Sequence, residues 1–311
     1  MLRYIAKRSL MMIPVLLGIS LIVFSIMELT PGDPVSLMLG EGASEQAVQE
    51  LREQMGLNDN FFIKYVRYVK NAVTGDLGIS YRNKVPVISE ITSRFPTTLN
   101  LTFWGVVLSV VIGIPVGIIS AVKQYTIIDS MSLLAALILT SMPAFWLGLM
   151  LILLFSLKWN LLPATGVSTW QHFIMPAITL AAASMATIIR MTRSTMLEVV
   201  RQDYIRTARA KGASEFRIVY KHALRNALLP VVTVVGLNFG YQLGGAIVTE
   251  SVFAMPGIGT LMVAAVRTKD TPIVMASVLF VAFLAGVINL IVDVLYVYID
   301  PRLKSEYVKN K

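Results

Sequence analysis

The sequence contains no cysteine and few charged residues. None of its 311 residues is Cys, and Asp, Glu, Lys and Arg together make up 14%, whereas an ordinary soluble domain has about 25%. The lack of cysteine excludes disulfide bonds, thiolate metal sites and cysteine nucleophiles. The shortage of charge, with 56% hydrophobic residues and a mean hydropathy of +0.70, excludes a disordered chain, a coiled coil and a typical soluble globule. This composition predicts an all-α, polytopic membrane protein.

Ionisable side chains are almost missing from the long apolar runs. The carboxylates nearest to these runs lie at or near their ends, at Glu28, Asp129, Glu250 and Asp293. The two histidines, His172 and His222, lie outside the runs. A carrier coupled to protons or sodium ions often needs a carboxylate or a histidine near the bilayer midplane, so the sequence argues against that class. We expect no catalytic residues and no metal site.

A phosphate-binding loop is also missing. The pattern Gly-x-x-x-x-Gly-Lys-Ser/Thr does not occur, nor does any Gly-Lys pair. If ATP drives this protein, ATP and Mg²⁺ must therefore be bound by another polypeptide, and we expect this chain to bind no cofactor and to be no enzyme. The net charge of +9 sits between the apolar runs, where cations meet lipid head groups. We therefore expect membrane lipid as a partner, and no nucleic acid.

Six apolar runs are long enough to cross a membrane, since a helix needs about 20 residues to span roughly 30 Å of hydrocarbon. They are Leu10–Leu29, Leu99–Val122, Met131–Leu157, Met175–Ile189, Leu228–Val248 and Ile273–Tyr298. The fourth run is the shortest, and a re-entrant or interfacial segment is the alternative there. Lys7 and Arg8 precede the first run and no small-x-small pattern follows it, so we expect an uncleaved anchor.

The distribution of cations predicts the orientation of the spans. Segments 1–9, 123–130, 190–227 and 299–311 contain 17 Lys and Arg, whereas the longer intervening segments contain 10. Cytoplasmic loops carry the excess of cations, so both termini are predicted to be cytoplasmic, which requires an even number of spans. The predicted parts are the N-terminus and first span at 1–29, an external segment at 30–98 and five further spans at 99–311, with a cytoplasmic loop at 190–227.

Two amphipathic helices are expected within the external segment. Ser44 is suited to cap the first helix, which Gly56 ends, and Gly75 ends the second. These helices either cover the outer ends of the spans or provide a docking surface for an external partner, and the sequence leaves both alternatives open.

The fifth apolar run carries two different faces. Gly236, Gly240 and Gly244 repeat every four residues and form a face that lets helices approach closely. Asn238 and Gln242 lie two residues away from these glycines, about 200° around the helix. The two amides either form hydrogen bonds to neighbouring helices or line a translocation pathway for a polar solute.

The cytoplasmic loop 190–227 contains nine basic residues and is predicted to form two short helices. The first has an apolar face of Met196, Val199, Val200 and Tyr204, and the second one of Phe216, Val219, Tyr220, Ala223 and Leu224. Gly212 is suited to a left-handed stop after the first helix, and Ser214 can cap the second. A basic loop lying on anionic lipid is the alternative, but a glycine turn between two helices favours a rigid docking element.

Several motifs resemble one family of transporters. Arg206-Thr-Ala-Arg-Ala-Lys-Gly212 resembles the E-A-A-x-x-x-G cytoplasmic loop of permease subunits in binding-protein-dependent ABC importers. The stretches that resemble the dipeptide, oligopeptide, glutathione and nickel branch of that family are Thr30-Pro-Gly-Asp-Pro34, Gly75-Asp-Leu-Gly-Ile-Ser80, Asp203 to Gly212, His222 to Pro230 and Asp300-Pro-Arg302. The resemblance covers nearly the whole chain.

Position by position, Ala208 and Gly212 match the family's loop motif. Arg206 stands where the general motif has Glu, and Thr207 stands where it has the first Ala. The resemblance implies that the loop, with these four residues and Ser214, seats in a groove of an ATP-binding subunit and couples ATP binding to the spans.

The resemblance also implies a function, a location and partners. It implies one of two transmembrane subunits of an importer in a bacterial plasma membrane, forming half of the translocation pathway. The implied partners are a second homologous permease, two ATP-binding subunits and an extracytoplasmic substrate-binding protein. The implied substrate is a small peptide, with a dipeptide first and oligopeptide, glutathione or nickel as alternatives. A self-sufficient secondary transporter or channel is the competing hypothesis.

Overall fold

The computed structural model describes residues 2–30, 33–40 and 43–299, and these residues form helices. Within them, the β-structure consists of an isolated antiparallel bridge between Ile79 and Pro86. The all-α prediction is therefore confirmed. The motif residues Pro31, Gly32 and Asp300-Pro-Arg302 lie outside the described residues. The chain divides into two units, residues 1–98 with 256–284 and residues 99–255 with 285–311, each of which has a core of its own.

Unit 1 contains the first span and the external segment. Its elements are α1 (Leu2–Leu29), α2 (Pro34–Leu39), α3 (Glu45–Gln54), α4 (Phe61–Val73), α12 (Ile258–Arg267) and the first turns of α5 (Val87–Val122) and α13 (Thr271–Ile299). The cap predicted for Ser44 is confirmed, because its side chain accepts a hydrogen bond from Ala47 N at 3.2 Å. The core of the unit joins α5, α12 and α13 through the buried side chains of Ile91, Ile258 and Ile273.

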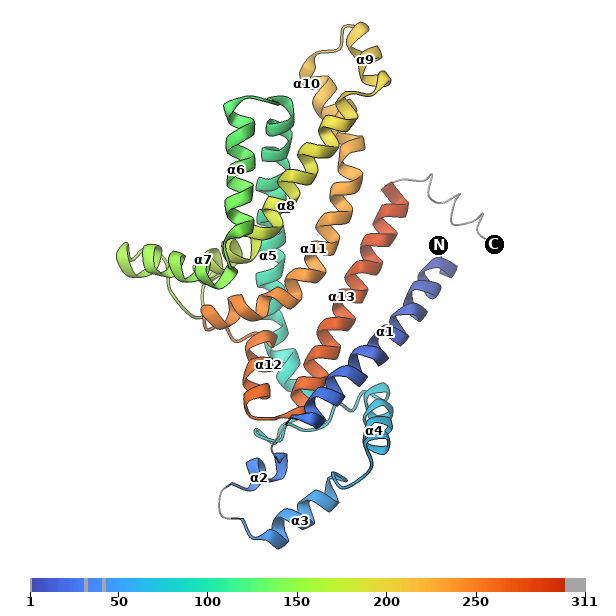
Figure 1. The fold of residues 1–311 in the computed structure, drawn as a ribbon, viewed down its shortest axis with the longest axis vertical. Helices are drawn as coiled ribbons and strands as arrows, with labels where there is room; N and C mark the ends of the chain where they lie inside the picture. The colour runs from blue at the N-terminus through green and yellow to red at the C-terminus, as the bar shows by residue number, and fades with distance from the viewer. Residues whose placement is uncertain (1, 31–32, 41–42, 300–311) are drawn as a thin grey trace. The chain divides into compact units, whose positions relative to one another are not determined.

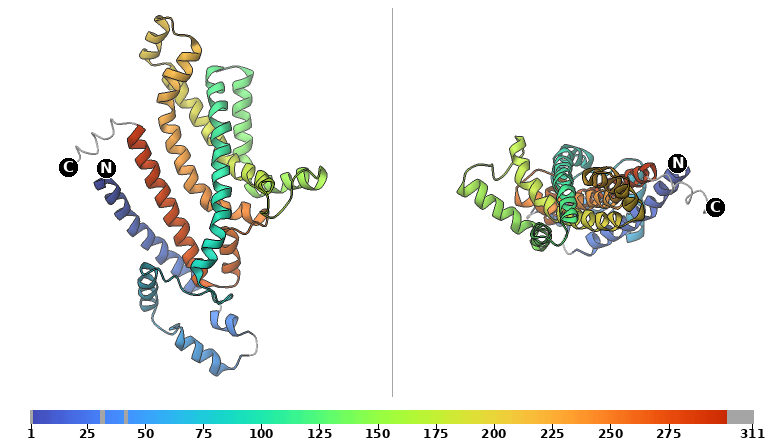
Figure 2. Two further views of the ribbon diagram at one scale, coloured as in Figure 1. Left: turned by 180° about the vertical axis from the view of Figure 1, so that it is seen from behind. Right: turned by 90° about the horizontal axis from the view of Figure 1, so that it is seen from above.

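Unit 2 contains the remaining helices, together with the rest of α5 and of α13. They are α6 (Ile127–Ser141), α7 (Ala144–Leu151), the π-helix η1 (Ile152–Lys158), the 3₁₀ turn η2 (Trp170–Phe173), α8 (Ile174–Val200), α9 (Asp203–Ala210), α10 (Glu215–Arg217), the π-helix η3 (Ile218–Ala223) and α11 (Leu224–Val252). Helix α8 contacts α6 on one side and α11 on the other (Figure 1). Seen from behind, α5 and α6 form a hairpin (Figure 2).

Close helix contacts in unit 2 depend on glycine. A Cβ atom added at Gly113 would lie 2.9 Å from Ile188 of α8, and one added at Gly117 would lie 2.6 Å from Thr192. The fifth run behaves similarly at one position, because a Cβ added at Gly236 would overlap Val292 of α13. No described residue lies within 4 Å of the equivalent position at Gly244, so the predicted small face is in close contact along only part of its length.

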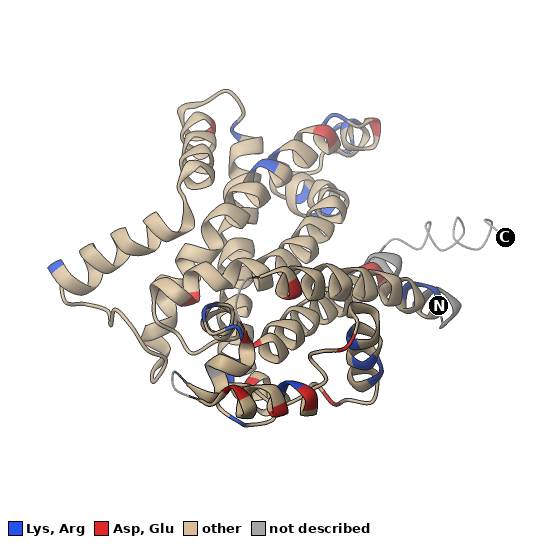
Figure 3. Cartoon of the chain, turned by 60° about the horizontal axis from the view of Figure 1, so that its bottom comes forward, with Lys and Arg blue, Asp and Glu red and all other residues tan. Residues whose placement is uncertain are grey.

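Five of the six predicted spans are long apolar helices of α1, α5, α8, α11 and α13. The fourth run, short in the sequence, belongs to the 27-residue helix α8, because the chain stays helical for eleven residues beyond Ile189. The long helices carry few charges, which gather on the short helices and loops (Figure 3). These features confirm a multi-pass membrane protein.

The third predicted span, Met131–Leu157, is not one straight helix, and its break lies at the proline that the sequence offers for a kink, Pro143. Helices α6 and α7–η1 are bent by 101° at a break around Met142. Pro143 disfavours the helical conformation of the residue before it, and Met142 is extended, with φ −79° and ψ 123°. Helix α6 has 15 residues and is about 22 Å long, less than the roughly 30 Å of a hydrocarbon core. The described residues thus contain five helices that are long and apolar enough to span a membrane, or six spans if the bent pair counts as one.

The orientation of the spans is open to a direct test, because the chain has no native Cys. We expect Lys211→Cys to react with a membrane-impermeant maleimide only from the cytoplasmic side, and Asn83→Cys only from the outside. Both positions are exposed, so access to the reagent depends on the membrane alone. Labelling of both cysteines from the same side of sealed vesicles would contradict the predicted orientation.

Candidate functional site

The cytoplasmic loop forms a sharp turn between two helical segments, which we call the elbow (residues 203–223). Helix α9 ends at Ala210, and Gly212 follows with φ +81°. Its N–H donates to Arg209 O at 2.9 Å, and Ala213 N–H donates to Ala208 O at 3.2 Å. This pair of bonds is a Schellman motif, which satisfies the last carbonyls of a helix through a left-handed residue. The left-handed stop predicted at Gly212 is confirmed.

Two side-chain interactions hold the two arms of the elbow together. Arg209 binds Glu215 through two parallel hydrogen bonds, from Nε at 2.7 Å and Nη2 at 3.1 Å. These bonds raise the pKa of the Arg209 guanidinium. Ser214 caps α10 as predicted and accepts a hydrogen bond from Arg217 N at 3.4 Å. The elbow therefore has a defined angle, although the ion pair is exposed and adds little to stability.

The base of the elbow is packed into unit 2. Ile205 and Ile218, one from each arm, are fully buried against Met196 of α8 and Ile118 of α5. The other members of this cluster are Ala121, Val219, Ala223 and Ala227. A side chain in such a cluster contacts several neighbours at once, so the elbow is attached to the ends of α5, α8 and α11 as one body.

The outer surface of the elbow presents the residues singled out from the family motif. Arg206, Thr207, Gly212 and Ser214 are exposed, and Ala208 is half-buried. Thr207 is held by a hydrogen bond from Oγ1 to Asp203 O at 3.0 Å. The backbone carbonyl of Ala208 is one of the two acceptors in the Schellman motif, so this position contributes through its backbone.

The predicted pair of short helices needs correction. Residues Met196, Val199 and Val200 belong to α8, which ends at Val200, and only Tyr204 lies on the short helix α9. The second helix runs on through η3 into α11 without a break. Its buried residues are Ile218, Val219 and Ala223, whereas Phe216 is 74% exposed and Tyr220 is 48% exposed. The π-helical turn has more residues per turn than an α-helix, which rotates Phe216 and Tyr220 out of the predicted face.

The two amides of the fifth run lie on α11. Gln242 is 2% exposed, and its Nε2 donates to Ser184 Oγ of α8 at 2.8 Å. Asn238 is half-buried, and its buried Nδ2 atom has no hydrogen-bond partner among the described residues. The contacts of Gln242 are those expected if it packs between helices. A role of either amide in the pathway stays a prediction.

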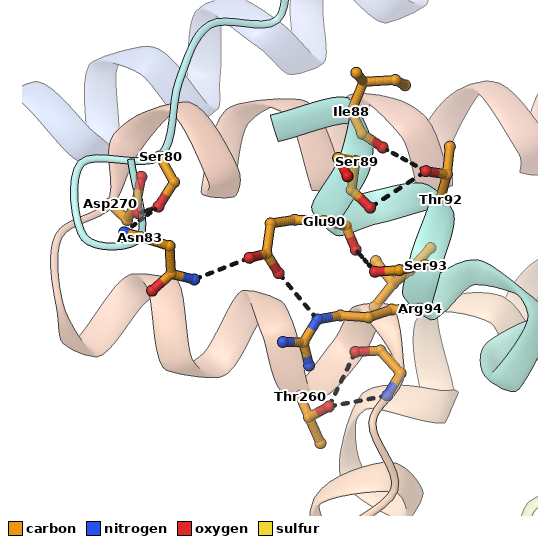
Figure 4. Close-up of polar contacts among 12 residues, drawn as sticks. Ser80, Asn83, Ile88, Ser89, Glu90, Thr92, Ser93, Arg94, Thr260 and Asp270 are labelled. Atoms are coloured by element: carbon orange, nitrogen blue, oxygen red, sulfur yellow. Dashed lines mark hydrogen bonds and ion pairs between the residues drawn. The ribbon is translucent and has the colours of Figure 1, made fainter. Parts of the chain in front are cut away.

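In unit 1, the motif Gly75 to Ser80 continues into a loop that is bound to Asp270. This carboxylate is 3% exposed and accepts hydrogen bonds from Ser80 Oγ, from Tyr81 N at 3.1 Å and from Arg82 N at 3.3 Å. Glu90 of α5 lies nearby, where it accepts hydrogen bonds from Asn83 and Arg94 (Figure 4). The loop is thus shaped by a residue 190 positions away in the sequence, which the sequence pattern did not indicate.

We expect Asp270→Asn to loosen this loop, because an amide offers one acceptor where the carboxylate offers two. Limited proteolysis between Ser80 and Pro86 should become faster at unchanged amounts of membrane-inserted protein. Glu50→Gln is the control, since it removes the same charge from an exposed carboxylate on α3 of the same unit. Equal protease resistance of Asp270→Asn and the unmodified protein would contradict the anchoring role.

Comparison with known proteins decides the family. The sequence profile of the binding-protein-dependent transport system inner membrane component matches residues 113–305, and the profile of the N-terminal part of such membrane components matches residues 1–102. The chain belongs to this family. Its membership confirms a permease that works with a substrate-binding and an ATP-binding component.

The permease is similar to several relatives along nearly its whole length. It is 44% identical to the dipeptide transport system permease protein DppB of Alkalihalophilus pseudofirmus, over 98% of this chain and 100% of that protein. It is 45% identical to a glutathione transport system permease protein GsiC of Escherichia coli, over 98% of this chain and 99% of that protein.

Solved structures share the fold of this permease. An inward-facing structure of the MetNI methionine ABC transporter matches with a TM-score of 0.53 and 22% identity, over 65% of this chain and 93% of that chain. An amino acid ABC transporter with histidines matches with a TM-score of 0.51 and 18% identity, over 69% and 94%. These likenesses extend the fold of the permease to transporters of distant sequence.

Proposed function

We propose that this permease is one of the two transmembrane subunits of an ATP-driven importer for small peptides. The observation that carries the proposal is its 44–45% identity, over 98% of the chain, to a dipeptide permease and a glutathione permease. Dipeptides are the first substrate candidate, with oligopeptide, glutathione and nickel as alternatives. An extracytoplasmic binding protein would deliver the substrate and set most of the specificity.

The elbow is the element that would receive the motion of an ATP-binding subunit. ATP and Mg²⁺ would be held by two such subunits, and a second homologous permease would complete the pathway. Arg206, Thr207 and Gly212 lie on the outer surface of the elbow, where a groove of the ATP-binding subunit would contact them. Because Ile205 and Ile218 attach the elbow to the helix ends, a push on its surface is passed to the spans.

The proposal is tested by reconstitution in proteoliposomes. The complete complex is given its binding protein outside the vesicles and ATP in their lumen, which corresponds to the cytoplasm, and it should then take up labelled alanyl-alanine. Competition with unlabelled glutathione and nickel should rank the substrates. The permease alone should transport none of these in an ion gradient. Uptake by the isolated chain, driven by a proton or sodium gradient, would instead support the competing hypothesis of a secondary transporter.

A further inference from the structure

A buried carboxylate joins three helices beside the base of the elbow. Asp129, in the first turn of α6, is 3% exposed. Its Oδ1 accepts hydrogen bonds from Ser120 Oγ of α5 at 2.6 Å and from Arg193 Nε of α8 at 2.7 Å. Its Oδ2 accepts from Arg193 Nη2 at 2.8 Å and from Tyr125 N at 3.0 Å. Four donors thus converge on the two oxygens of an almost fully buried side chain.

The site also holds the loop that connects α5 to α6. Tyr125 has φ +65°, a left-handed conformation that is uncommon outside glycine. The hydrogen bond from its backbone N–H to Asp129 stabilises the loop in that conformation. The α5–α6 connection is therefore tied to α8 by the same carboxylate that binds Arg193.

One face of α8 connects this ion pair to the elbow. Arg193 and Met196 are three residues apart on the helix and so lie on neighbouring positions of one face. Met196 is fully buried against Ile205 and Ile218 of the elbow. On α5, Ile118 and Ala121 of the same cluster flank Ser120. The elbow base and the ion pair are therefore adjacent parts of one packed region in unit 2.

From this geometry we infer that the Asp129–Arg193 ion pair is a positioning element that makes α6 follow the elbow when the ATP-binding subunits move it. The inference rests on the proposed function. Asp129 is buried and both its oxygens are occupied, while Arg193 is half-buried, so the pair has one well-defined arrangement. Losing Arg193 leaves a buried carboxylate without its counter-charge. Without the pair, α8 and the elbow would move while α6 stays behind, and ATP hydrolysis would no longer drive the spans.

The sharpest variant is Arg193→Lys. It keeps the positive charge, but an ammonium cannot form the two parallel bonds of the guanidinium. In the reconstituted complex we expect the number of peptides imported per ATP hydrolysed to fall about tenfold, the scale of typical coupling between sites. Binding of the ATP-binding subunits and basal ATPase activity should be retained. Arg94→Lys is the matched control, since Arg94 pairs with Glu90 at 3.3 Å on a more exposed surface of unit 1.

A second measurement reports positioning without any substrate. Spin labels at Ile127→Cys on α6 and Lys211→Cys on the elbow give one distance within unit 2, because the chain has no other Cys. In the full complex, this distance should stay narrow and constant with and without ATP, and Arg193→Lys should broaden it. Asp129→Asn combined with Arg193→Lys should be no worse than either change alone, as for two partners of one interaction.

The outcomes distinguish the positioning role of the ion pair from the proposed transport function. An unchanged transport ratio with an unchanged distance distribution overturns the positioning role. A reduced amount of assembled complex with a normal ratio in the remaining fraction also overturns it, because the pair then serves stability alone. If the unmodified complex imports no peptide, the proposed function fails, and the label distances, which need no peptide, still decide the role of the ion pair.

Discussion

Gly212→Val should abolish uptake while the protein still reaches the membrane. Gly212 has φ +81°, and no atom of the described residues lies within 4 Å of an added Cβ, so the substitution introduces no clash with them. Its effect is on the backbone, where a left-handed conformation costs a non-glycine residue about 1–2 kcal/mol. Valine is β-branched and is a particularly poor fit for this conformation. We expect the Schellman motif to open and the angle between the two arms of the elbow to change. The altered elbow would no longer fit a rigid groove of the ATP-binding subunit.

The measurement is uptake together with substrate-stimulated ATPase activity in the reconstituted complex. Gly212→Asn is the matched variant, since asparagine enters the left-handed region more readily, and it should keep most of the uptake. Gly75→Val is the control for strain, because Gly75 has φ +85° and equally open surroundings but lies in the external segment. Normal uptake with normal stimulation in Gly212→Val would show that the elbow does not couple the subunits.

Gly117→Ala should be among the most destabilising single-methyl changes in the chain. The added Cβ would lie 2.6 Å from Thr192 Cβ and 2.8 Å from the backbone O of Ile189. A side chain can rotate away, but a helix backbone carbonyl cannot, so α5 and α8 would have to separate. Inserting a methyl group into a well-packed region costs about 1–3 kcal/mol, and we expect the upper part of that range here. Close approach of small residues is what holds membrane helices together.

Thermal unfolding of the purified subunit in detergent is the appropriate measurement. Gly244→Ala is the control, because nothing lies within 4 Å of an added Cβ there, and it should unfold at the temperature of the unmodified protein. If Gly117→Ala unfolds at that temperature too, then α5 and α8 are not held at the short separation seen in the structure.

Local chemistry allowed several features to be predicted from the sequence. The stop at Gly212 and the caps at Ser44 and Ser214 depend on residues within one or two turns, and a left-handed backbone or a short hydroxyl side chain has few alternatives there. Long apolar runs identify spans in the same way, since only a helix satisfies its own backbone groups within a bilayer. The motif around the elbow, being long and at a suitable position, indicated the family.

Other features were decided by the tertiary structure, because they depend on which helices meet. A kink at Pro143 in the third apolar run follows from the proline itself, but its angle of 101° was decided by the tertiary structure. The π-helical turn η3 exposed Phe216 and Tyr220, because hydrophobic spacing assumes a regular helix. Asp129 was noted only as a carboxylate at the end of a span. Its partner Arg193 is 64 residues away in the sequence. The ion pair that lets Asp129 be buried therefore forms only when α6 and α8 pack together.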